Sequence, residues 1–201
     1  GHAQQTLARN RPLDEYQNLL VSNLEEYERL ARMIDSMLFL ARTEQANASI
    51  NRQTVDLHEL LEQLCEYFEG TAQESAMALI NQASGTLIAD PQLLRRALAN
   101  LLANALRYGL PDSAVTISSH LRDGTCEISV HNAGPAIAAE HLPRLFERFY
   151  RCDPSRNQPD DSGGLGLAIV RSIMQAHGGQ VSVESNEAGT RFSLLFPLTK
   201  A

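Results

Sequence analysis

Two asparagines and an arginine stand at helical spacing near the middle of the chain, at Asn100, Asn104 and Arg107. Because these positions are i, i+4 and i+7, an α-helix places both amides and the guanidinium group on one face. A solvated polar stripe has the same pattern. Asparagine disfavours helix interiors, however, so two of them carry a free-energy cost unless they bind something. The face is therefore a candidate ligand-binding surface.

Two glycine-containing segments follow. In the first, Asn132 and Gly134 stand where a predicted strand ends, just before the apolar Ile137. Most such sequences are simple strand-ending turns. In the second, residues 162–169 (Ser-Gly-Gly-Leu-Gly-Leu-Ala-Ile) carry their glycines straight into a predicted helix. Backbone N–H groups can approach an anion there, at the positive end of the helix dipole. The segment fits neither the Walker nor the dinucleotide fingerprint. The order and spacing of all three segments indicate nucleotide binding.

The apolar pattern after residue 54 predicts a mixed domain. Asp90-Pro91 is a good helix start, with an N-cap followed by proline at the first helical position, and Gly178-Gly179 is a good stop. We expect an α+β fold in which strands form one layer and helices the other, a two-layer α/β sandwich. The expected helices lie near 57–74, 91–108 and 165–177, and the expected strands near 77–82, 86–89, 114–120, 125–131, 180–185 and 190–197.

The polar segment 150–163 contains two prolines and falls between predicted elements of this domain. A long loop of that composition in a compact domain is more often a mobile lid than a connector. The sequence therefore predicts a lid here.

An apolar seam precedes this domain. Apolar residues between 19 and 41 recur at spacings of 4, 3, 4, 3, 4 and 3, which is a heptad pattern. A flanking apolar row widens the stripe and favours packing inside a helical bundle. The seam consists of Leu20, Leu24, Tyr27, Ala31, Ile34, Leu38 and Ala41, and the flanking row of Leu30, Met33, Met37 and Leu40.

The segments around the seam suggest a shortened helical hairpin. Arg11-Pro12 precedes the helix, and acidic residues in its first turn complement the helix dipole. The preceding residues resemble the last turns of another helix, too short to stand alone. We expect a tag remnant at 1–2, partial dimerisation helices at 3–43 and a polar linker at 44–53.

Composition excludes several classes of function. The chain has 201 residues, 17 basic and 24 acidic, and a net charge of −7, which argues against nucleic acid as a partner. Its three cysteines are far apart and form no metal-ligand spacing, so they are expected to be reduced thiols. No apolar run is long enough to cross a bilayer. We therefore expect a soluble chain without membrane contact.

The motifs, taken in order, resemble the N, G1, F, G2 and G3 boxes of sensor histidine kinases across residues 54–198. The helix at 22–41 and the segment 142–151 resemble more narrowly the heavy-metal (copper/silver) sensor branch. The resemblance implies the Bergerat ATP-binding fold, shared with gyrase, Hsp90 and MutL proteins, at residues 54–201. The boxes are Asn100-xxx-Asn104-Ala-xx-Tyr108, Asn132-x-Gly134, Leu145-Phe-Glu-Arg-Phe-Tyr-Arg151, Gly164-Leu-Gly166-Leu-Ala-Ile-Val and Gly189-Thr190-Arg-Phe.

The resemblance also implies roles for individual residues. By position, Asn104 would hold the Mg²⁺ that bridges the triphosphate, and Asn100 would assist it. Arg107 and Arg151 would contact phosphates, and Tyr108 would pack on the adenine. Asn100, Asn104 and Arg151 would be the catalytic residues. ATP and Mg²⁺ are the implied cofactors.

Residues 150–163 would be the ATP lid, with Phe146 and Phe149 as its hydrophobic hinge, although both could equally be core residues. Gly134, Gly164 and Gly166 would provide backbone freedom. The complete implied nucleotide site comprises Asn100, Asn104, Arg107, Tyr108, Asn132, Gly134, Ile137, Phe146, Phe149, Arg151, Gly164, Leu165, Gly166, Leu167 and Thr190.

Three positions depart from related proteins. Asn132 replaces the usual aspartate, so its bond to the adenine amino group lacks charge assistance and is weaker by about 1 kcal/mol. Ser162 replaces a glycine, which would stiffen the lid. Asn100 stands where related ATPases have a glutamate that activates water. Since an amide cannot act as a general base, slow hydrolysis and phosphotransfer to an imidazole are expected.

The resemblance implies a kinase that phosphorylates a histidine of its dimerisation helix and then a response regulator. It would be a homodimer at the cytoplasmic side of the bacterial inner membrane. The acceptor segment is expected upstream of Ala3, because His2 has neither the acidic neighbour nor the proline of that motif. We expect this chain to bind Mg-ATP without phosphorylating itself. A Bergerat ATPase or chaperone and a nucleotide-free interaction module remain as alternatives.

Overall fold

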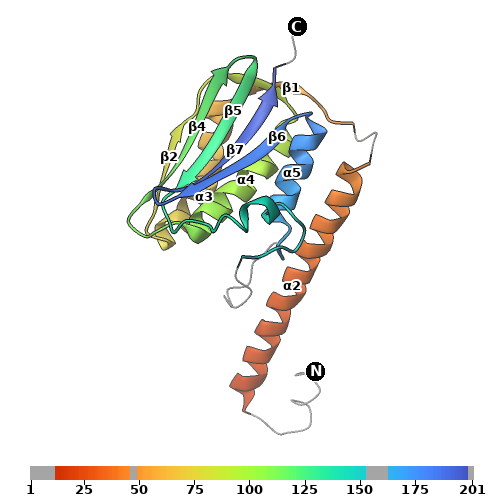
Figure 1. Cartoon of the computed structure of the whole chain (residues 1–201). Coiled ribbons are helices and arrows are strands. Elements are labelled where there is room, and N and C mark those ends of the chain that lie inside the picture. Colours follow the sequence, from red (N-terminus) through yellow and green to blue (C-terminus); the bar gives the residue numbers. More distant parts are fainter. Residues whose placement is uncertain (1–11, 46–48, 153–162, 199–201) are drawn as a thin grey trace.

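The computed structural model describes residues 12–45, 49–152 and 163–198. A five-stranded sheet forms one layer, and helices cover one of its faces (Figure 1). The sheet strands are Ala78–Gln82 (β2), Ala114–Arg122 (β4), Thr125–Asn132 (β5), Gln180–Asn186 (β6) and Gly189–Pro197 (β7), and the covering helices are Leu57–Glu74 (α3), Pro91–Tyr108 (α4) and Gly166–Ala176 (α5). The strand order is β2-β4-β5-β7-β6, with β2 parallel to β4 and the other neighbours antiparallel. This architecture confirms the predicted two-layer α/β sandwich.

Local capping determines where the covering helices begin and end. Asp56 caps α3 by accepting the backbone N–H of Glu59 at 3.0 Å. Asp90 likewise accepts two N–H groups in the first turn of α4, with Pro91 at the first helical position, where its missing N–H is not needed. After α5, Gly178 adopts a φ of +70°, which glycine does without steric cost. The predicted helix at 91–108 is confirmed, and α5 falls within one residue of its predicted bounds.

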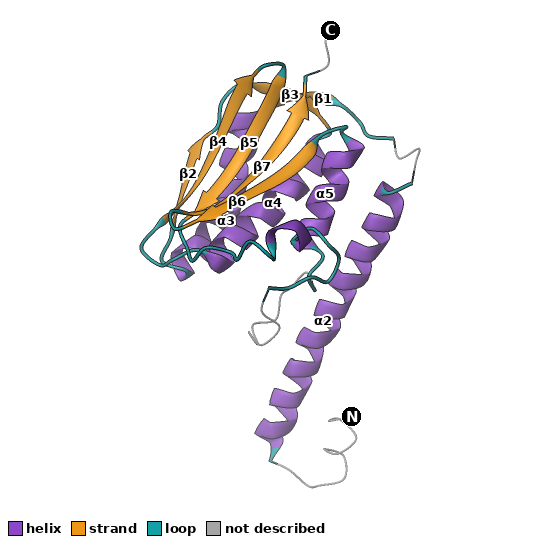
Figure 2. Cartoon of the chain, in the orientation of Figure 1, coloured by secondary structure: helices purple, strands orange, loops and turns teal. Residues whose placement is uncertain are grey.

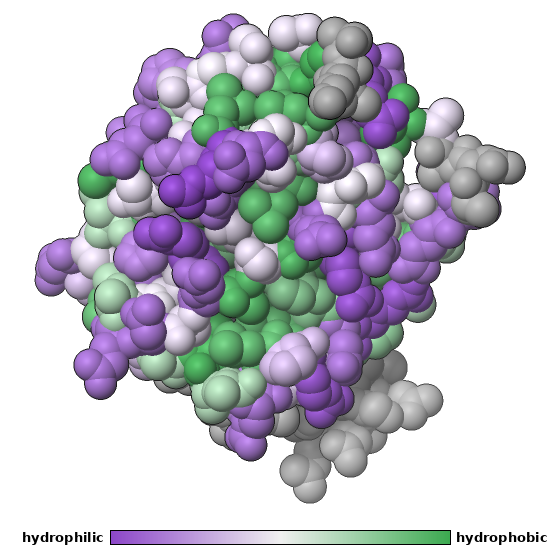
Figure 3. Space-filling model, turned by 45° about the horizontal axis from the view of Figure 1, so that its top comes forward, coloured by the Kyte–Doolittle hydropathy of each residue, from purple (hydrophilic) through white to green (hydrophobic). Residues whose placement is uncertain are grey.

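The core lies between the two layers. Val115 and Ile117 of β4 and Ile128 of β5 are completely buried against the helices. Each fully buried leucine contributes about 1.5–3 kcal/mol relative to an exposed one, and α4 has four without exposure, Leu94, Leu98, Leu101 and Leu102. This face anchors α4 on the sheet. Apolar patches also remain between polar side chains on the surface (Figure 3), as is normal for folded proteins.

A long helix, α2 (Leu13–Thr43), packs on the domain through its C-terminal half (Figure 1). Leu40 is 1% exposed, and Met33 and Phe39 pack against the core. The sequence pattern suggested that Leu40 and Met33 widen the seam. In the structure, both residues face the domain instead. The seam itself is exposed: for example, Tyr27 is 68% and Ile34 58% accessible to solvent. No described helix is long and apolar enough to span a membrane.

Two elements were not predicted. Strand β1 (Gln53–Asp56) pairs antiparallel with β3 (Thr86–Ala89) in a separate two-stranded sheet. Only Val55 of β1 is apolar, so the strand has no alternating pattern, and it begins inside the expected linker 44–53. A short 3₁₀ helix, η1 (Leu142–Arg144), follows β5.

Three expectations lie outside the described residues: the tag remnant, the hairpin segment before residue 12 and most of the lid.

Candidate functional site

The polar face of α4 lies against the start of α5. The Nδ2 atom of Asn100 donates a hydrogen bond to the backbone oxygen of Gly166 at 3.1 Å, which brings the amide face next to the glycine segment. The loop after β5 runs along the same end of the two layers toward η1 (Figure 2). The three motifs therefore meet at one end of the domain.

The remaining polar residues of this face follow along α4. Asn104 and Arg107 are half-buried, and Tyr108, the last residue of the helix, is 46% exposed. The guanidinium carbon of Arg107 lies 5.5 Å from the centre of the Tyr108 ring. Arg151, half-buried, stands near the start of the expected lid. The α4 residues therefore offer amide, cationic and aromatic groups to a common region.

Asn132, the last residue of β5, is 4% exposed. Its Nδ2 atom donates to the backbone oxygen of Ala133 at 3.1 Å. Its Oδ1 atom is not one of the buried polar atoms that lack a hydrogen-bond partner, which within the described residues are Arg29 Nε and Ser172 Oγ. An amide oxygen can accept a hydrogen bond from an adenine amino group, so the residue fits the base of a nucleotide.

Close backbone approaches surround Asn132. A Cβ atom on Gly134 would lie 2.9 Å from the backbone oxygen of Tyr108, and one on Gly189 would overlap the backbone oxygen of Asn132. The Leu110 N–H also donates to the Ala133 oxygen at 3.0 Å. The predicted backbone freedom at Gly134 is therefore not the reason for this glycine, since its φ is not positive. The reason is the tight contact between the turn and the end of α4.

A hydroxyl pair supports this turn from the sheet. Thr190, 6% exposed, lies opposite Asn132 in the β5–β7 register. Its Oγ1 atom is 2.8 Å from Oγ of Ser185, which accepts the Ile137 N–H at 2.9 Å. The sequence prediction missed Ser185, because only its register opposite Thr190 in β6 identifies it. The predicted residues Ile137 and Thr190 thus belong to one connected arrangement.

The two ends of the expected lid are bonded together. The Phe149 N–H donates to the backbone oxygen of Gly164 at 2.9 Å, and both residues have a positive φ, 63° and 80°. Phe146 is buried and packs edge-to-face on Phe192 with ring centres 6.0 Å apart. Phe149 is 51% exposed. The core interpretation therefore applies to Phe146 alone.

The glycine segment continues into α5. Leu165 is completely buried, Gly166 is the first residue of the helix, and Leu167 packs partly against the core. Gly164 uses the expected backbone freedom, whereas Gly166 has no positive φ. Leu165 is a core anchor for the segment.

An aromatic cluster beside the lid ends was not predicted. The Tyr150 hydroxyl lies 2.5 Å from Nδ1 of His141, and the guanidinium carbon of Arg144 lies 4.4 Å from the Tyr150 ring centre. These residues come from η1 and its flanks, which carry no sequence periodicity. They hold the segment around η1 in place.

Helix α2 contacts the same region. The guanidinium group of Arg96 on α4 stacks 3.9 Å from the Phe39 ring centre and lies 3.7 Å from a carboxylate oxygen of Asp35. Burial lowers the pKa of Arg96, and Asp35 opposes that effect. Arg148 forms an ion pair with Glu44 at the end of α2. A Cβ atom on Gly163 would overlap Met33 of α2. The helix thus contacts α4 through Arg96, and it contacts the residues that flank the expected lid through Arg148 and Gly163.

The described residues of the site offer binding groups, and none of these groups is an obvious general base. Within residues 12–45, 49–152 and 163–198, no three His, Cys, Asp or Glu side chains cluster as metal ligands. The groups at hand are amides, backbone N–H groups at a helix start and arginines. Such groups bind and orient an anionic ligand, and amides cannot abstract a proton.

Comparisons with known proteins match this chain to one family and to sensor proteins. The family described as "Histidine kinase-, DNA gyrase B-, and HSP90-like ATPase" matches residues 89–200, more than half of the chain. "Sensor histidine kinase CusS" of Escherichia coli O157:H7 is 42% identical over 95% of this chain and 40% of its own length. "Sensor protein CzcS" of Cupriavidus metallidurans is 42% identical over 100% of this chain and 42% of its own length. The chain thus spans about two fifths of these relatives.

A solved structure titled "ShkA full-length in complex with AMPPNP" superimposes on 96% of this chain and 41% of its own, with a TM-score of 0.79 and 26% identity. Its fold matches that of the described residues.

Proposed function

Because the chain belongs to the histidine kinase-, DNA gyrase B- and HSP90-like ATPase family, we propose that it binds Mg-ATP where α4, the turn after β5 and the start of α5 meet. The relatives "Sensor histidine kinase CusS" and "Sensor protein CzcS" support a role as the catalytic part of a sensor histidine kinase. The resemblance of the segments 22–41 and 142–151 suggests the heavy-metal branch. In the whole protein, the γ-phosphate passes to a histidine and then to a response regulator. That protein works at the cytoplasmic side of the inner membrane.

The observation that carries this proposal is the hydrogen bond from Asn100 to Gly166, which joins the amide face to the glycine segment. Asn132 supports it, because its Nδ2 atom donates to the Ala133 oxygen and leaves Oδ1 as the acceptor for a base. Asn132 suits the adenine base. The bond from Asn100 to Gly166 holds α4 next to the glycine segment, where the phosphates would bind. Neither arrangement is needed for a nucleotide-free interaction module.

The remaining residues take the positions that such a ligand requires. Asn104 presents an amide oxygen one turn beyond Asn100, suited to a hard cation. Mg²⁺ neutralises charge on the phosphates when it is bound. Arg107 and Arg151 supply cationic groups for the phosphates, and Tyr108 an apolar ring face for the base. The close packing of Gly134 keeps the turn near that face.

Transfer is favoured over hydrolysis because of Asn100. Its side chain cannot take a proton from water, and its Nδ2 atom is already bonded to Gly166.

The exposed seam of α2 supports dimerisation as a second part of the proposal. Its apolar side chains suit a helical bundle between two copies in the whole protein.

Binding is tested by Asn104→Ala, measured by calorimetry with a non-hydrolysable ATP analogue and Mg²⁺. We expect at least about tenfold weaker binding, because one bond to a charged group is worth about 1.5–3 kcal/mol. Asn18→Ala, an exposed asparagine on α2, is the matched control and should bind normally. An unchanged affinity of Asn104→Ala in a folded protein would refute the assignment.

The preference for transfer is tested by Asn100→Glu, with Asn100→Gln as a control of the same length. A general base contributes about 10²–10⁴-fold, so we expect phosphate release to rise at least about tenfold in the glutamate variant alone. Rapid phosphate release by the unaltered chain would favour the ATPase alternative. With γ-labelled ATP, this chain should acquire no acid-labile, base-stable label.

A further inference from the structure

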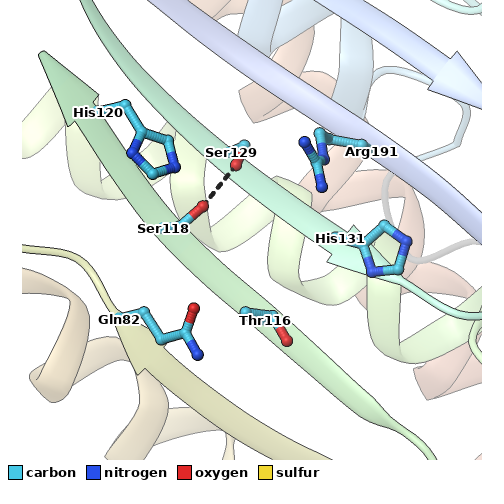
Figure 4. Close-up of a pocket in the computed structure, with 7 residues that line it drawn as sticks. All are labelled: Gln82, Thr116, Ser118, His120, Ser129, His131 and Arg191. Carbon is cyan, nitrogen blue, oxygen red and sulfur yellow. Dashed lines mark hydrogen bonds between the residues drawn. The ribbon is translucent and has the colours of Figure 1, made fainter.

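The sheet face opposite the helices carries a hollow of about 360 Å³. No described helix covers this face (Figure 1). Residues from four strands line the hollow, and all of them are polar (Figure 4). They are Gln82, Thr116, Ser118, His120, Ser129, His131 and Arg191.

The hollow exists because two small residues meet at the centre of the sheet. Ser118 and Ser129 lie opposite each other in the β4–β5 register, with hydroxyl oxygens 2.8 Å apart. Ser129 is only 3% exposed, although it belongs to the uncovered face. Larger side chains at either end of the pair, such as His120 and His131, form the rim (Figure 4). The floor is therefore hydroxylic and sheltered.

The rim is rich in hydrogen-bond donors. Arg191 lies beside His131 in the β5–β7 register and carries five guanidinium N–H groups. In the described part of the chain, Arg191 forms no ion pair within 4.0 Å. Histidine donates from both ring nitrogens when it is protonated. No carboxylate lines the hollow.

The nearest charged groups of the same face lie outside the hollow. Glu127 of β5 accepts a hydrogen bond from the Ser193 hydroxyl at 2.7 Å. Glu184 of β6 lies opposite Arg191 in register, and Arg122 stands at the far end of β4. Glu127 also lies opposite His120 in register, and neither carboxylate is among the residues that line the hollow. The lining itself therefore carries donors and no carboxylate, which suits an oxyanion.

We propose that this hollow binds a phosphate group, either free or as the end of a small monoester. Arg191 pairs with the phosphate oxygens, and His131 and the floor hydroxyls donate to it. The hollow is larger than one phosphate needs, so an ester has room. Since successive side chains of a strand alternate faces, Val115 and Ile117 separate this site from the helix side. The proposal is independent of ATP binding.

The test follows the imidazole NMR signals of His120 and His131 at a fixed pH. The chain is titrated with inorganic phosphate and, separately, with glycerol phosphate. We expect saturable shifts of both signals with one dissociation constant, while His58 on the helix side stays unchanged. Tighter binding of glycerol phosphate indicates an ester, and equal binding indicates the free ion.

Variants make the test decisive. Arg191→Gln should weaken binding about tenfold, as expected for a charged hydrogen-bond donor. Arg122→Gln makes the same change of charge on the same face outside the hollow and should leave binding within about twofold. Ser118→Val suits a strand and fills the floor, so binding should be lost in a folded protein. Non-saturable shifts, or equal weakening by both arginine variants, would overturn the proposal.

Discussion

The side chain of Asn132 makes the substitution Asn132→Asp informative, because the two oxygens of aspartate cannot reproduce both functions of the amide. In the structure, Nδ2 donates to the Ala133 oxygen at 3.1 Å, and the residue is 4% exposed. An aspartate loses that donor, at about 1 kcal/mol, and places a carboxylate oxygen against a carbonyl oxygen, at a further 1–2 kcal/mol or so. We expect the free energy of unfolding to fall by about 2–3 kcal/mol.

Nucleotide affinity should move in the opposite direction. The carboxylate accepts the adenine amino group with charge assistance, a gain of about 1 kcal/mol that corresponds to roughly fivefold tighter binding. Urea unfolding without nucleotide measures the first effect, and calorimetry with an ATP analogue measures the second. The structure therefore predicts lower stability together with higher affinity in the same variant.

Asn186→Asp is the matched control. The Oδ1 atom of Asn186 accepts the Ala188 N–H at 2.8 Å at an exposed position, so an aspartate keeps this bond. Its stability should change by no more than about 0.5 kcal/mol. If Asn132→Asp unfolds at the same urea concentration as the unaltered chain, the bond to Ala133 is not what orients the amide. The assignment of Oδ1 to the adenine then fails as well.

Three further outcomes follow from the packing. Gly134→Ala should lower the free energy of unfolding by about 1–3 kcal/mol in urea, because its Cβ atom meets the Tyr108 oxygen at 2.9 Å; Gly70→Ala, with open space at its Cβ position, should not. Leu40→Ala should cost about 2–5 kcal/mol in thermal unfolding, since Leu40 is 1% exposed where α2 docks, and a cost under about 0.5 kcal/mol would mean that α2 is not docked. Burial lowers the pKa of His177, whose Nε2 accepts the Asp90 N–H at 3.0 Å. As pH falls below about 6.5, the unfolded chain therefore takes up a proton that the folded protein resists, and urea unfolding should show stability declining toward pH 5. A His177→Gln variant with the same decline would contradict this.

The sequence predicted elements whose ends carry local chemistry. Asp90-Pro91 marks α4 because capping involves neighbouring residues alone. Strand β1 escaped prediction because Gln53–Asp56 contains one apolar residue and exists through its pairing with β3. The heptad pattern predicted α2, but which side of it docks depends on α5 and Arg96, which are distant in the chain.

In the candidate site, too, local patterns were predicted and contacts between distant residues were not. Residue types and spacing predicted the amide face of α4, since helical periodicity places Asn100 and Asn104 together. The bond from Asn100 to Gly166 joins residues 66 positions apart, and no local pattern contains it. Ser185 was missed for the same reason, and the Tyr150 cluster was missed because η1 and its flanks carry no sequence periodicity. Gly134 was predicted as a site residue, but for backbone freedom instead of close packing.

The hydrogen bond between Phe149 and Gly164 closes the base of the segment between them. Because this bond fixes both residues on the domain, sequence changes between them leave the core positions of Phe146 and Leu165 unchanged. Insertions, deletions and changes of composition can therefore accumulate between Phe149 and Gly164 while the scaffold stays constant.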